Sequence, residues 1–394
     1  MNAYFDHADA AGARQWLKEP WEFMSEQMKT QSLMDTAKAL IADDKGLLAM
    51  DESNPTCNKR FAKLGIPQTV EARRAYRELI VTTPGLGKHI SGAILYDETI
   101  RQLDGNGVFF ASILKDAGII PGIKVDAGAK DLAGHPGEKI TEGLDGLRER
   151  LAEYSQMGAR FAKWRAVLTI GEGIPSRSSI EANAHALARY AALCQEAGLV
   201  PIVEPEVLMD GAHTLDCCRQ VTEEVLRNVF IQLNCQRVLL EGMILKPNMV
   251  LPGLACPPGK EVNEVAVGEQ QYQVRLTDRP PDEEPELDEV ANLTMKTLWR
   301  TVPAAVPGIA FLSGGQSPEL ASARLNLMNL RFKAQLPWAL SFSFARAIQQ
   351  PAMEMWRGKE TNVKAAQQAL LHRAQCNRAA RRGEYTAAME TSAP

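Results

Sequence analysis

Short apolar runs alternate along this chain with longer segments in which apolar residues recur every three or four positions. Runs of the first kind are typical of buried β-strands, and segments of the second kind are typical of amphipathic helices. The expected strands are Gly46–Asp51, Ser91–Asp97, Ile120–Asp126, Arg160–Leu168, Leu199–Val207, Leu240–Lys246, Gly308–Ser313 and Trp338–Phe344. The expected helices are Val70–Thr82, Gly143–Met157, Ile180–Ala197, His213–Asn234, Val290–Thr301 and Pro318–Leu330.

About eight strands, each followed by a helix or a long loop, predict the α/β class and a parallel (β/α)8 TIM barrel. An open doubly wound sheet is the alternative. That fold normally carries a glycine-rich phosphate loop after its first strand. The segment that follows the first strand here, Asp51-Glu52-Ser53-Asn54-Pro55, is not glycine-rich. The barrel is therefore the favoured architecture.

We expect a single domain, residues 1–394, with a barrel core at about 40–350. The N-terminal segment 1–40 has a helical pattern and is expected to cover one end of the barrel. Residues 257–289 are rich in charge and proline, which indicates a solvated excursion loop; a partner-docking loop is the alternative. Residues 354–394 predict a C-terminal helix and a short tail.

Composition excludes several classes of function. The 394 residues are 45% hydrophobic and 23% charged, and the net charge of −4 gives no general attraction for nucleic acid or an anionic membrane. No apolar run is long enough for a transmembrane helix, and the N-terminus has no signal-peptide core, so we expect a cytoplasmic protein. The seven cysteines and six histidines show no metal-binding spacing, and we expect neither a metal nor a cofactor.

Lys246 lies in an apolar run, Met243–Val250, that predicts a buried strand with a proline stop. A buried ammonium is poorly solvated, so the pKa of this lysine should fall and the neutral amine should become accessible. A neutral amine beside acids is what Schiff-base chemistry on a carbonyl requires. The alternative is a lysine that extends its ammonium into solvent, or one that is paired for structural reasons.

Charged and polar residues gather where the expected strands end, which is where TIM barrels place their active sites. Each one alone has a structural explanation as an ion-pair partner or a turn residue. Together they are better explained by an anionic substrate, because buried ion pairs add little to stability. The residues are Asp51, Lys124, Lys163, Arg165, Glu204, Glu206, Lys246, Ser313–Ser317 and Arg346.

These groups divide by chemistry. Ser313, Gly314 and Gly315 after the seventh strand, with Arg346 after the eighth, match the usual phosphate site of barrel enzymes. A second phosphate could be held across the mouth by Lys124, Arg165 and Arg60. That leaves Lys246 as the nucleophile.

Lys163 is then a neighbouring cation that lowers the pKa of Lys246 further. Glu204 and Asp51 remain as candidate proton-transfer groups.

With these residues in place, the chain resembles the class I fructose-bisphosphate aldolases, the metal-independent Schiff-base type. The matching segments occur in family order over roughly residues 40–385. They are Gly46–Ser53, Gly122–Asp126, Phe161–Arg165, Val203–Glu206, Leu245–Met249, Phe311–Ser317 and Trp338–Phe342.

The resemblance implies roles for the matching residues. Lys246 would form the Schiff base, Glu204 would shuttle protons during imine formation, and Asp51 would take the hydroxyl proton during cleavage. Lys163 would sit beside the imine, and Glu206 would orient the basic residues. The substrates would be a phosphorylated ketose and aldose, with one phosphate on Ser313, Gly314, Gly315 and Arg346 and the other near Lys124, Arg165 and Arg60. The family is usually tetrameric, so we expect a homo-oligomer.

Two features depart from the family pattern. Many members end in a tyrosine that reaches the active site, whereas this chain ends Met389–Pro394, soon after Tyr385, which is not an obvious substitute. The excursion at 257–289 also looks longer than usual.

Two other functions remain open: a transaldolase-like or deoxyribose-phosphate-type Schiff-base lyase, and a sugar-phosphate-binding barrel without catalysis.

Overall fold

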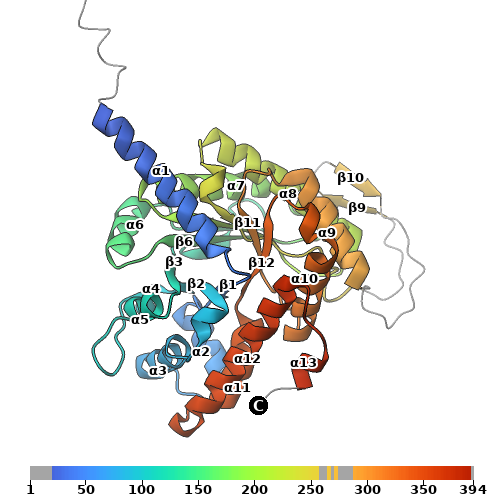
Figure 1. Ribbon diagram of the computed structural model, residues 1–394. Helices are drawn as coiled ribbons and strands as arrows, with labels where there is room; N and C mark the ends of the chain where they lie inside the picture. Colours follow the sequence, from blue (N-terminus) through green and yellow to red (C-terminus); the bar gives the residue numbers. More distant parts are fainter. Residues whose placement is uncertain (1–19, 257–263, 268–269, 274–286, 392–394) are drawn as a thin grey trace, which may run out of the picture.

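A computed structural model describes residues 20–256, 264–267, 270–273 and 287–391. Eight parallel strands close into a barrel in the order β1-β12-β11-β8-β7-β6-β3-β2, and helices surround it (Figure 1). The predicted TIM barrel is therefore confirmed. The strands are β1 (Gly46–Ala49), β2 (Ile90–Leu95), β3 (Ile120–Lys124), β6 (Phe161–Leu168), β7 (Val200–Val207), β8 (Ile244–Leu245), β11 (Gly308–Phe311) and β12 (Ala339–Phe344).

Every predicted strand falls on a barrel strand, but the sixth is much shorter than its apolar run. Leu240–Gly242 forms the 3-10 turn η3, and only Ile244–Leu245 pairs as β8. The prediction of a strand from Leu240 was wrong because an apolar run alone does not show where regular pairing begins. Lys246 consequently lies directly after the strand, at the barrel mouth.

The six predicted helices are present as α3 (Val70–Val81), α6 (Leu147–Gln156), α7 (Arg177–Glu196), α8 (Leu215–Cys235), α9 (Leu287–Thr301) and α10 (Pro318–Phe332). The pattern missed α2 (Asn54–Lys63), α4 (Asp97–Ile100), α5 (Phe110–Asp116) and α11 (Arg346–Trp356). It also missed the antiparallel hairpin of β4 (Gly128–Asp131) and β5 (Lys139–Glu142). Helices α4 and α5 are short, and α2 buries only Cys57 and Phe61, which leaves too few apolar positions for a visible period. Helix α11 is different: it buries Ile348, Met353 and Trp356, an apolar face that was overlooked in the prediction from sequence.

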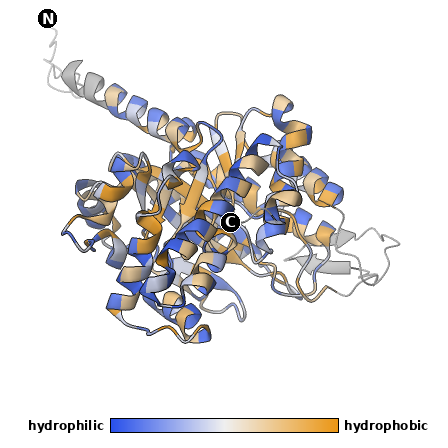
Figure 2. Ribbon diagram, turned by 60° about the horizontal axis from the view of Figure 1, so that its bottom comes forward, coloured by the Kyte–Doolittle hydropathy of each residue, from blue (hydrophilic) through white to orange (hydrophobic). Residues whose placement is uncertain are grey.

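The N-terminal helix α1 (Pro20–Leu40) packs its last turns against the amino-terminal end of the barrel. Its residues Leu33, Ala37 and Leu40 join a buried cluster with Leu47 of β1 and Phe161 of β6. Phe161 fills the barrel so closely that a Cβ on residue 122 would lie 2.2 Å from its ring, which explains the glycine of β3. The helix thus closes one end and leaves the opposite end as the mouth. In Figure 2, hydrophobic residues are prominent in the central strands, while the helices carry both classes.

The C-terminal region forms α12 (Val363–Arg382) and α13 (Ala388–Thr391), and α12 packs against α10 and α11 (Figure 1). Within the predicted excursion 257–289, β9 (Glu264–Val267) and β10 (Gln270–Gln273) pair as an antiparallel hairpin, and α9 begins at Leu287. The rest of that excursion, like residues 1–19 of the predicted N-terminal segment, lies outside the described residues. No helix in the described part of the chain is long and apolar enough to cross a membrane.

Candidate active site

Strand alternation aims the basic and acidic side chains of β6 and β7 into the barrel mouth. Lys163 and Arg165 are two residues apart on β6, so they point to the same side. Trp164 between them points outward and packs against Tyr190 of α7, with ring centroids 5.5 Å apart. Because Arg165 pairs in register with Glu204 of β7, the two strands deliver their inward residues to the same level.

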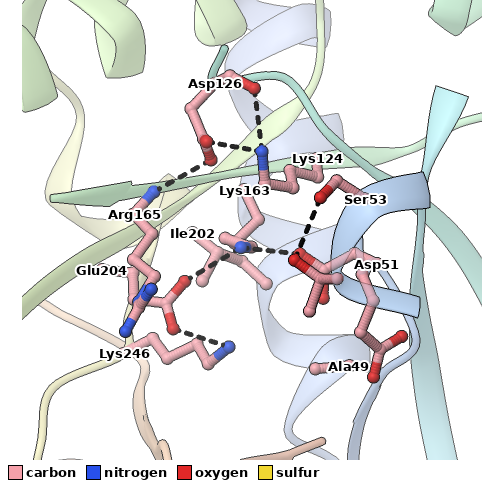
Figure 3. Close-up of polar contacts among 12 residues, drawn as sticks. Ala49, Asp51, Ser53, Lys124, Asp126, Lys163, Arg165, Ile202, Glu204 and Lys246 are labelled. Atoms are coloured by element: carbon pink, nitrogen blue, oxygen red, sulfur yellow. Dashed lines mark hydrogen bonds and ion pairs between the residues drawn. The ribbon is translucent and has the colours of Figure 1, made fainter. Parts of the chain in front are cut away.

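At the centre of the mouth, two lysines and two carboxylates form one connected chain (Figure 3). The Nζ atom of Lys163 lies 2.6 Å from Oδ2 of Asp51 and 3.2 Å from Oε2 of Glu204. The other carboxylate oxygen of Glu204, Oε1, lies 2.9 Å from Nζ of Lys246. Glu204 therefore bridges the two ammonium groups, and Lys163 separates it from Asp51.

Lys246 is buried, with 3% of its surface exposed. The alternative in which its ammonium extends into solvent is therefore wrong. The lysine is paired, as the other alternative states, because its ammonium contacts Glu204. Its backbone N–H donates to the carbonyl of Val203 at 2.8 Å, which extends the β7–β8 pairing by one residue. The base of the side chain is fixed, and its amine is directed at an acid.

The charges of this chain shift each other's pKa. Burial alone would raise the pKa of Asp51, but the ammonium groups of Lys163 and Lys246 outweigh it and hold that pKa far below its usual range. Glu204 behaves in the same way: burial raises its pKa, and Lys163 and Lys246 lower it overall. Burial disfavours the charged form of Lys163, yet Asp51 and Glu204 raise its pKa above the ordinary lysine value. Both carboxylates are thus ionised at neutral pH.

The remaining basic residues of β3 and β6 are held by carboxylates at the rim. The ammonium of Lys124 lies 2.5 Å from Oδ1 of Asp126 and donates to the Asp126 carbonyl at 2.9 Å. Arg165 donates from Nε to Glu206 at 2.5 Å, and its backbone N–H donates to Oδ2 of Asp126 at 3.3 Å. The side chain of Arg165 is 42% exposed, so much of its guanidinium faces the mouth.

A second basic group lies after β11 and β12. Gly314 and Gly315 have φ angles of 55° and 89°, in the left-handed region that favours glycine. A Cβ on residue 315 would lie 3.3 Å from Nη2 of Arg346, so the guanidinium rests against this turn. Ser313 directly precedes it. The structure therefore brings together the residues that the sequence grouped as a phosphate site.

Strand order places the two basic groups on opposite sides of the mouth. β11 and β12 are neighbours, and so are β3 and β6, and each pair lies half-way around the ring from the other. β8 and β7, which carry Lys246 and Glu204, fill the arc between them on one side, and β1 and β2 fill the other. A ligand with an anionic group at each end would thus span the lysine–carboxylate chain.

Arg60 lies near this mouth but is tied to a residue that the sequence did not single out. Its Nη1 lies 2.5 Å from Oε1 of Glu52, and Arg77 holds Oε2 of the same carboxylate at 2.8 Å. No role was predicted from the sequence for Glu52, Arg77 or Asp126. Asp126 offered a signal, since it follows Lys124 by two residues at a strand end. Glu52 and Arg77 offered no such signal, because they are far apart in the sequence. Only the fold brings Arg60 of α2 and Arg77 of α3 to the same Glu52 carboxylate.

Among the described residues, His372, Cys376 and Glu390 lie close enough to share a metal ion, with ligand atoms within 4.8 Å of one another. They lie on α12 and α13, outside the barrel. Arg373 already contacts both oxygens of Glu390 at 2.5 Å, and the Tyr385 hydroxyl donates to Oε1 at 2.7 Å. The Arg373 guanidinium would repel a metal cation at this place. The Tyr385 hydroxyl is already hydrogen-bonded to Glu390.

A parallel barrel with buried lysines and carboxylates at its mouth and a basic group on either side has the active-site arrangement of a (β/α)8 enzyme that acts on an anionic ligand. A family model described as "Glycolytic: Fructose-bisphosphate aldolase class-I" matches residues 32–276 and 278–394. The chain belongs to the class I fructose-bisphosphate aldolase family.

Individual relatives agree with this placement. The chain is 53% identical to a probable class 1 fructose-bisphosphate aldolase of Xanthomonas campestris over 91% of this chain and 99% of that protein. It is 46% identical to the cytosolic fructose-bisphosphate aldolase 4 of Arabidopsis thaliana over 93% of this chain and 86% of that protein. The solved aldolase of Plasmodium falciparum, in complex with TRAP and a small-molecule inhibitor, has a TM-score of 0.83 at 45% identity and covers 91% of this chain and 96% of its own.

Proposed function

We propose that this protein reversibly cleaves fructose 1,6-bisphosphate to dihydroxyacetone phosphate and glyceraldehyde 3-phosphate through a Schiff base on Lys246. The observation that carries the proposal is the buried contact of 2.9 Å between Lys246 Nζ and Glu204. It joins an amine nucleophile to a group that can remove and return its protons. The family membership of the chain supports the same reaction.

Imine formation needs proton transfers at one nitrogen and one oxygen. The neutral amine of Lys246 adds to the ketose carbonyl at C2 to give a carbinolamine, and loss of water leaves a protonated imine. Glu204 accepts the proton that the amine loses and returns one to the departing hydroxyl. Lys163, bound to the other Glu204 oxygen, holds the carboxylate in place through both steps.

Cleavage follows once the imine is protonated. Asp51 takes the proton of the C4 hydroxyl, the C3–C4 bond breaks, and its electron pair moves into the imine to give an enamine. Glyceraldehyde 3-phosphate leaves, C3 of the enamine is then protonated, and hydrolysis releases dihydroxyacetone phosphate and restores Lys246. The Asp51 carboxylate is ionised when the substrate binds, because, despite burial, Lys163 and Lys246 hold its pKa below the ordinary range, so it is free to accept a proton.

The two basic groups serve as anchors for the two phosphates. Ser313, the Gly314–Gly315 turn and Arg346 hold one phosphate, since backbone N–H groups and an arginine fork both match phosphate oxygens. The other phosphate is held by Lys124, Arg165 and Arg60, with Glu206 orienting Arg165. Binding both ends fixes the breaking bond beside Asp51, so contacts far from C4 support the chemistry.

A Schiff-base lyase for singly phosphorylated sugars is the second candidate. The basic groups on opposite sides of the mouth favour the bisphosphate, because a ligand with one phosphate would leave one group unused. A barrel that binds sugar phosphates without catalysis is the third, and it predicts binding with no covalent adduct. Cleavage rates on bisphosphate and monophosphate ketoses separate the first two candidates.

We also propose that the protein acts in the cytoplasm, in glycolysis or gluconeogenesis, as a homotetramer. The cytosolic relatives of Arabidopsis thaliana and the wording of the family model support the location and the pathway. The oligomer is the usual state of the family. Size-exclusion chromatography with light scattering tests it directly, and a monomeric mass would contradict it.

The experiment that tests the function is borohydride reduction in the presence of dihydroxyacetone phosphate, followed by peptide mapping. A stable adduct on Lys246 is expected, because reduction converts the imine into a secondary amine. Lys333 is the matched internal control, since its ammonium is exposed and pairs with Asp44 on the surface. Folded protein that binds the ligand but gives no adduct on Lys246 would rule out the Schiff base.

A further inference from the structure

Behind the barrel mouth, one buried amide joins helix α11 to both sides of Asp51. Gln349 lies one helical turn after Arg346 on α11 and is completely buried. Its Nε2 donates to the carbonyl of Ala49 at 2.6 Å and to Oε1 of Glu52 at 2.9 Å. Ala49 precedes Asp51 by two residues and Glu52 follows it directly, so both ends of this short segment are tied to the same helix.

The amide can make these bonds in one orientation only. The Tyr76 hydroxyl donates to Oε1 of Gln349 at 3.1 Å, which leaves both Nε2 hydrogens for the Ala49 and Glu52 oxygens. Tyr76 is itself fixed by aromatic packing, with its ring centroid 5.5 Å from Trp356 and 5.7 Å from Phe61. All the hydrogen-bonding groups of the amide face fixed partners, so it acts as a rigid link rather than a mobile contact.

Glu52 is equally constrained on its other side. Arg77 bonds to its carboxylate at 2.8 Å and to its backbone carbonyl at 3.2 Å, and Arg60 adds a third contact. The position of Asp51 therefore depends on Ala49, which Gln349 holds, and on Glu52, which Gln349 and Arg77 hold together. A movement of α11 relative to β1 would change where the Asp51 carboxylate points.

We infer that Gln349 is a positioning residue that couples phosphate binding by Arg346 to the position of the Asp51 carboxylate. The inference rests on the proposed function, in which Arg346 holds phosphate and Asp51 takes the proton. When phosphate fixes Arg346, the first turn of α11 is fixed, and Gln349 transmits that position to the Ala49–Glu52 segment. A misplacement of about 1 Å at a reacting group can lower a rate about 100-fold, so a link of this kind bears on the rate of cleavage.

The test replaces Gln349 by methionine, which keeps the volume of the side chain and removes both donors. Gln349→Met should lower kcat for fructose 1,6-bisphosphate at least about tenfold. Borohydride trapping of dihydroxyacetone phosphate at Lys246 should stay at the wild-type level, because imine formation uses Glu204 rather than Asp51. Gln350→Met is the matched control: it makes the same change on the neighbouring residue, whose amide donates to Glu354 at 2.6 Å, and kcat should not change.

A double-mutant cycle separates coupling from a purely structural role. Arg346→Ala should raise KM and lower kcat in the wild-type background. In the Gln349→Met background the loss of kcat on removing Arg346 should largely disappear, whereas the rise in KM should remain. Additive effects on kcat, or an unchanged kcat for folded Gln349→Met, would overturn the inference.

If Gln349→Met does not fold, Tyr76→Phe decides the question. It removes only the donor to Gln349 Oε1 and should lower kcat in the same direction by a smaller factor, with trapping intact. An unchanged kcat for Tyr76→Phe would then overturn the inference. Wild-type enzyme run in the same series distinguishes the two proposals, because a wild type that neither cleaves the bisphosphate nor forms the Lys246 adduct would end the proposed function itself.

Discussion

Lys246 and Glu204 form a buried acid–amine contact at the barrel mouth: their charged atoms lie 2.9 Å apart, and each residue is 3% exposed. They come from adjacent strands, since Val203 of β7 pairs in register with Leu245 of β8. Glu204 follows Val203 and Lys246 follows Leu245, so the strand pairing itself brings the two side chains together. The geometry of the barrel, rather than a flexible loop, sets the distance on which imine chemistry depends.

Replacing Lys246 by methionine should abolish cleavage and leave the fold intact. The side chain keeps its approximate length, and Glu204 keeps its contact with Lys163, so the buried carboxylate still has a cationic partner. We expect turnover of fructose 1,6-bisphosphate to fall below detection in a coupled assay, with an unchanged circular dichroism spectrum. Lys333→Met, at an exposed lysine, should retain full activity. Wild-type-like turnover in Lys246→Met would end the Schiff-base proposal.

Asp51 and Glu204 should affect different steps. Asp51→Asn removes the base for the C4 hydroxyl, so cleavage should slow by about 100-fold or more, while borohydride still traps dihydroxyacetone phosphate on Lys246. Glu204→Gln should slow the trapping itself, because the amide cannot take the proton of Lys246. Single-turnover trapping and steady-state cleavage, measured on both variants, check the assignment. Equal loss of trapping in the two variants would contradict it.

The sequence was sufficient to predict the barrel because its strands are buried on both faces and read as continuous apolar runs. Charged residues that interrupt such runs are conspicuous, which is why Lys163 on β6 and Glu204 on β7 stood out. The start of β8 was less predictable: the apolar run from Leu240 begins with a 3-10 turn that hydropathy cannot distinguish from a strand. The position of Lys246 was nevertheless predicted correctly as a strand end.

The links behind the mouth could not be predicted. Gln349 lies in a helix that the pattern missed, and its partner Glu52, 297 residues away along the chain, is brought to it by tertiary packing. A glutamine or a glutamate at such positions carries no signal of its own, since polar residues on helices are usually exposed. Lys163, Glu204 and Lys246 were visible because they lie on strands or directly after one, whereas Gln349 lies on a helix and Glu52 in a loop.

Removal of metal ions should leave activity unchanged. In the proposed mechanism the protonated imine on Lys246 takes up the electron pair of the breaking bond, which is the role that a metal ion would otherwise have. We expect the same kcat before and after dialysis against EDTA. A metal-dependent aldolase assayed in parallel supplies the control, because it should lose activity under the same treatment. Loss of activity that zinc restores would point to a different mechanism.

The thermal stability of the protein should decrease as the pH is lowered, and part of this decrease should come from protonation of Asp51. Its folded-state pKa is lowered from an ordinary value of 3.8, with burial opposing the shift and Lys163 and Lys246 causing it. The stabilisation is therefore fully present above the ordinary pKa and is lost as the pH falls through the lower, folded-state value. The difference in Tm between wild type and Asp51→Asn should be constant from about pH 5 to 7 and shift in favour of the variant below about pH 4. A Tm difference that stays constant from pH 7 to below pH 4 would contradict the ion pair of the Asp51 carboxylate with Lys163.

Arg346→Ala should weaken the binding of one substrate phosphate. A charge-assisted hydrogen bond contributes about 1.5–3 kcal/mol, so its loss should raise KM for fructose 1,6-bisphosphate by roughly tenfold to a hundredfold. The guanidinium is exposed and rests against the Gly315 turn, so its removal should leave Tm nearly unchanged. Arg357→Ala, at the exposed end of the same helix, is the matched control and should alter neither value.

Comparison of substrates then locates the phosphate that Arg346 holds. A ketose phosphorylated at a single carbon offers its phosphate to one of the two basic groups, so the Arg346→Ala effect on KM should persist for one of fructose 1-phosphate and fructose 6-phosphate and vanish for the other. Arg165→Ala should show the opposite preference, because Arg165 lies on β6 across the ring. If both variants affected the same monophosphate, the two groups would share one phosphate, and the mouth would hold the substrate by one end.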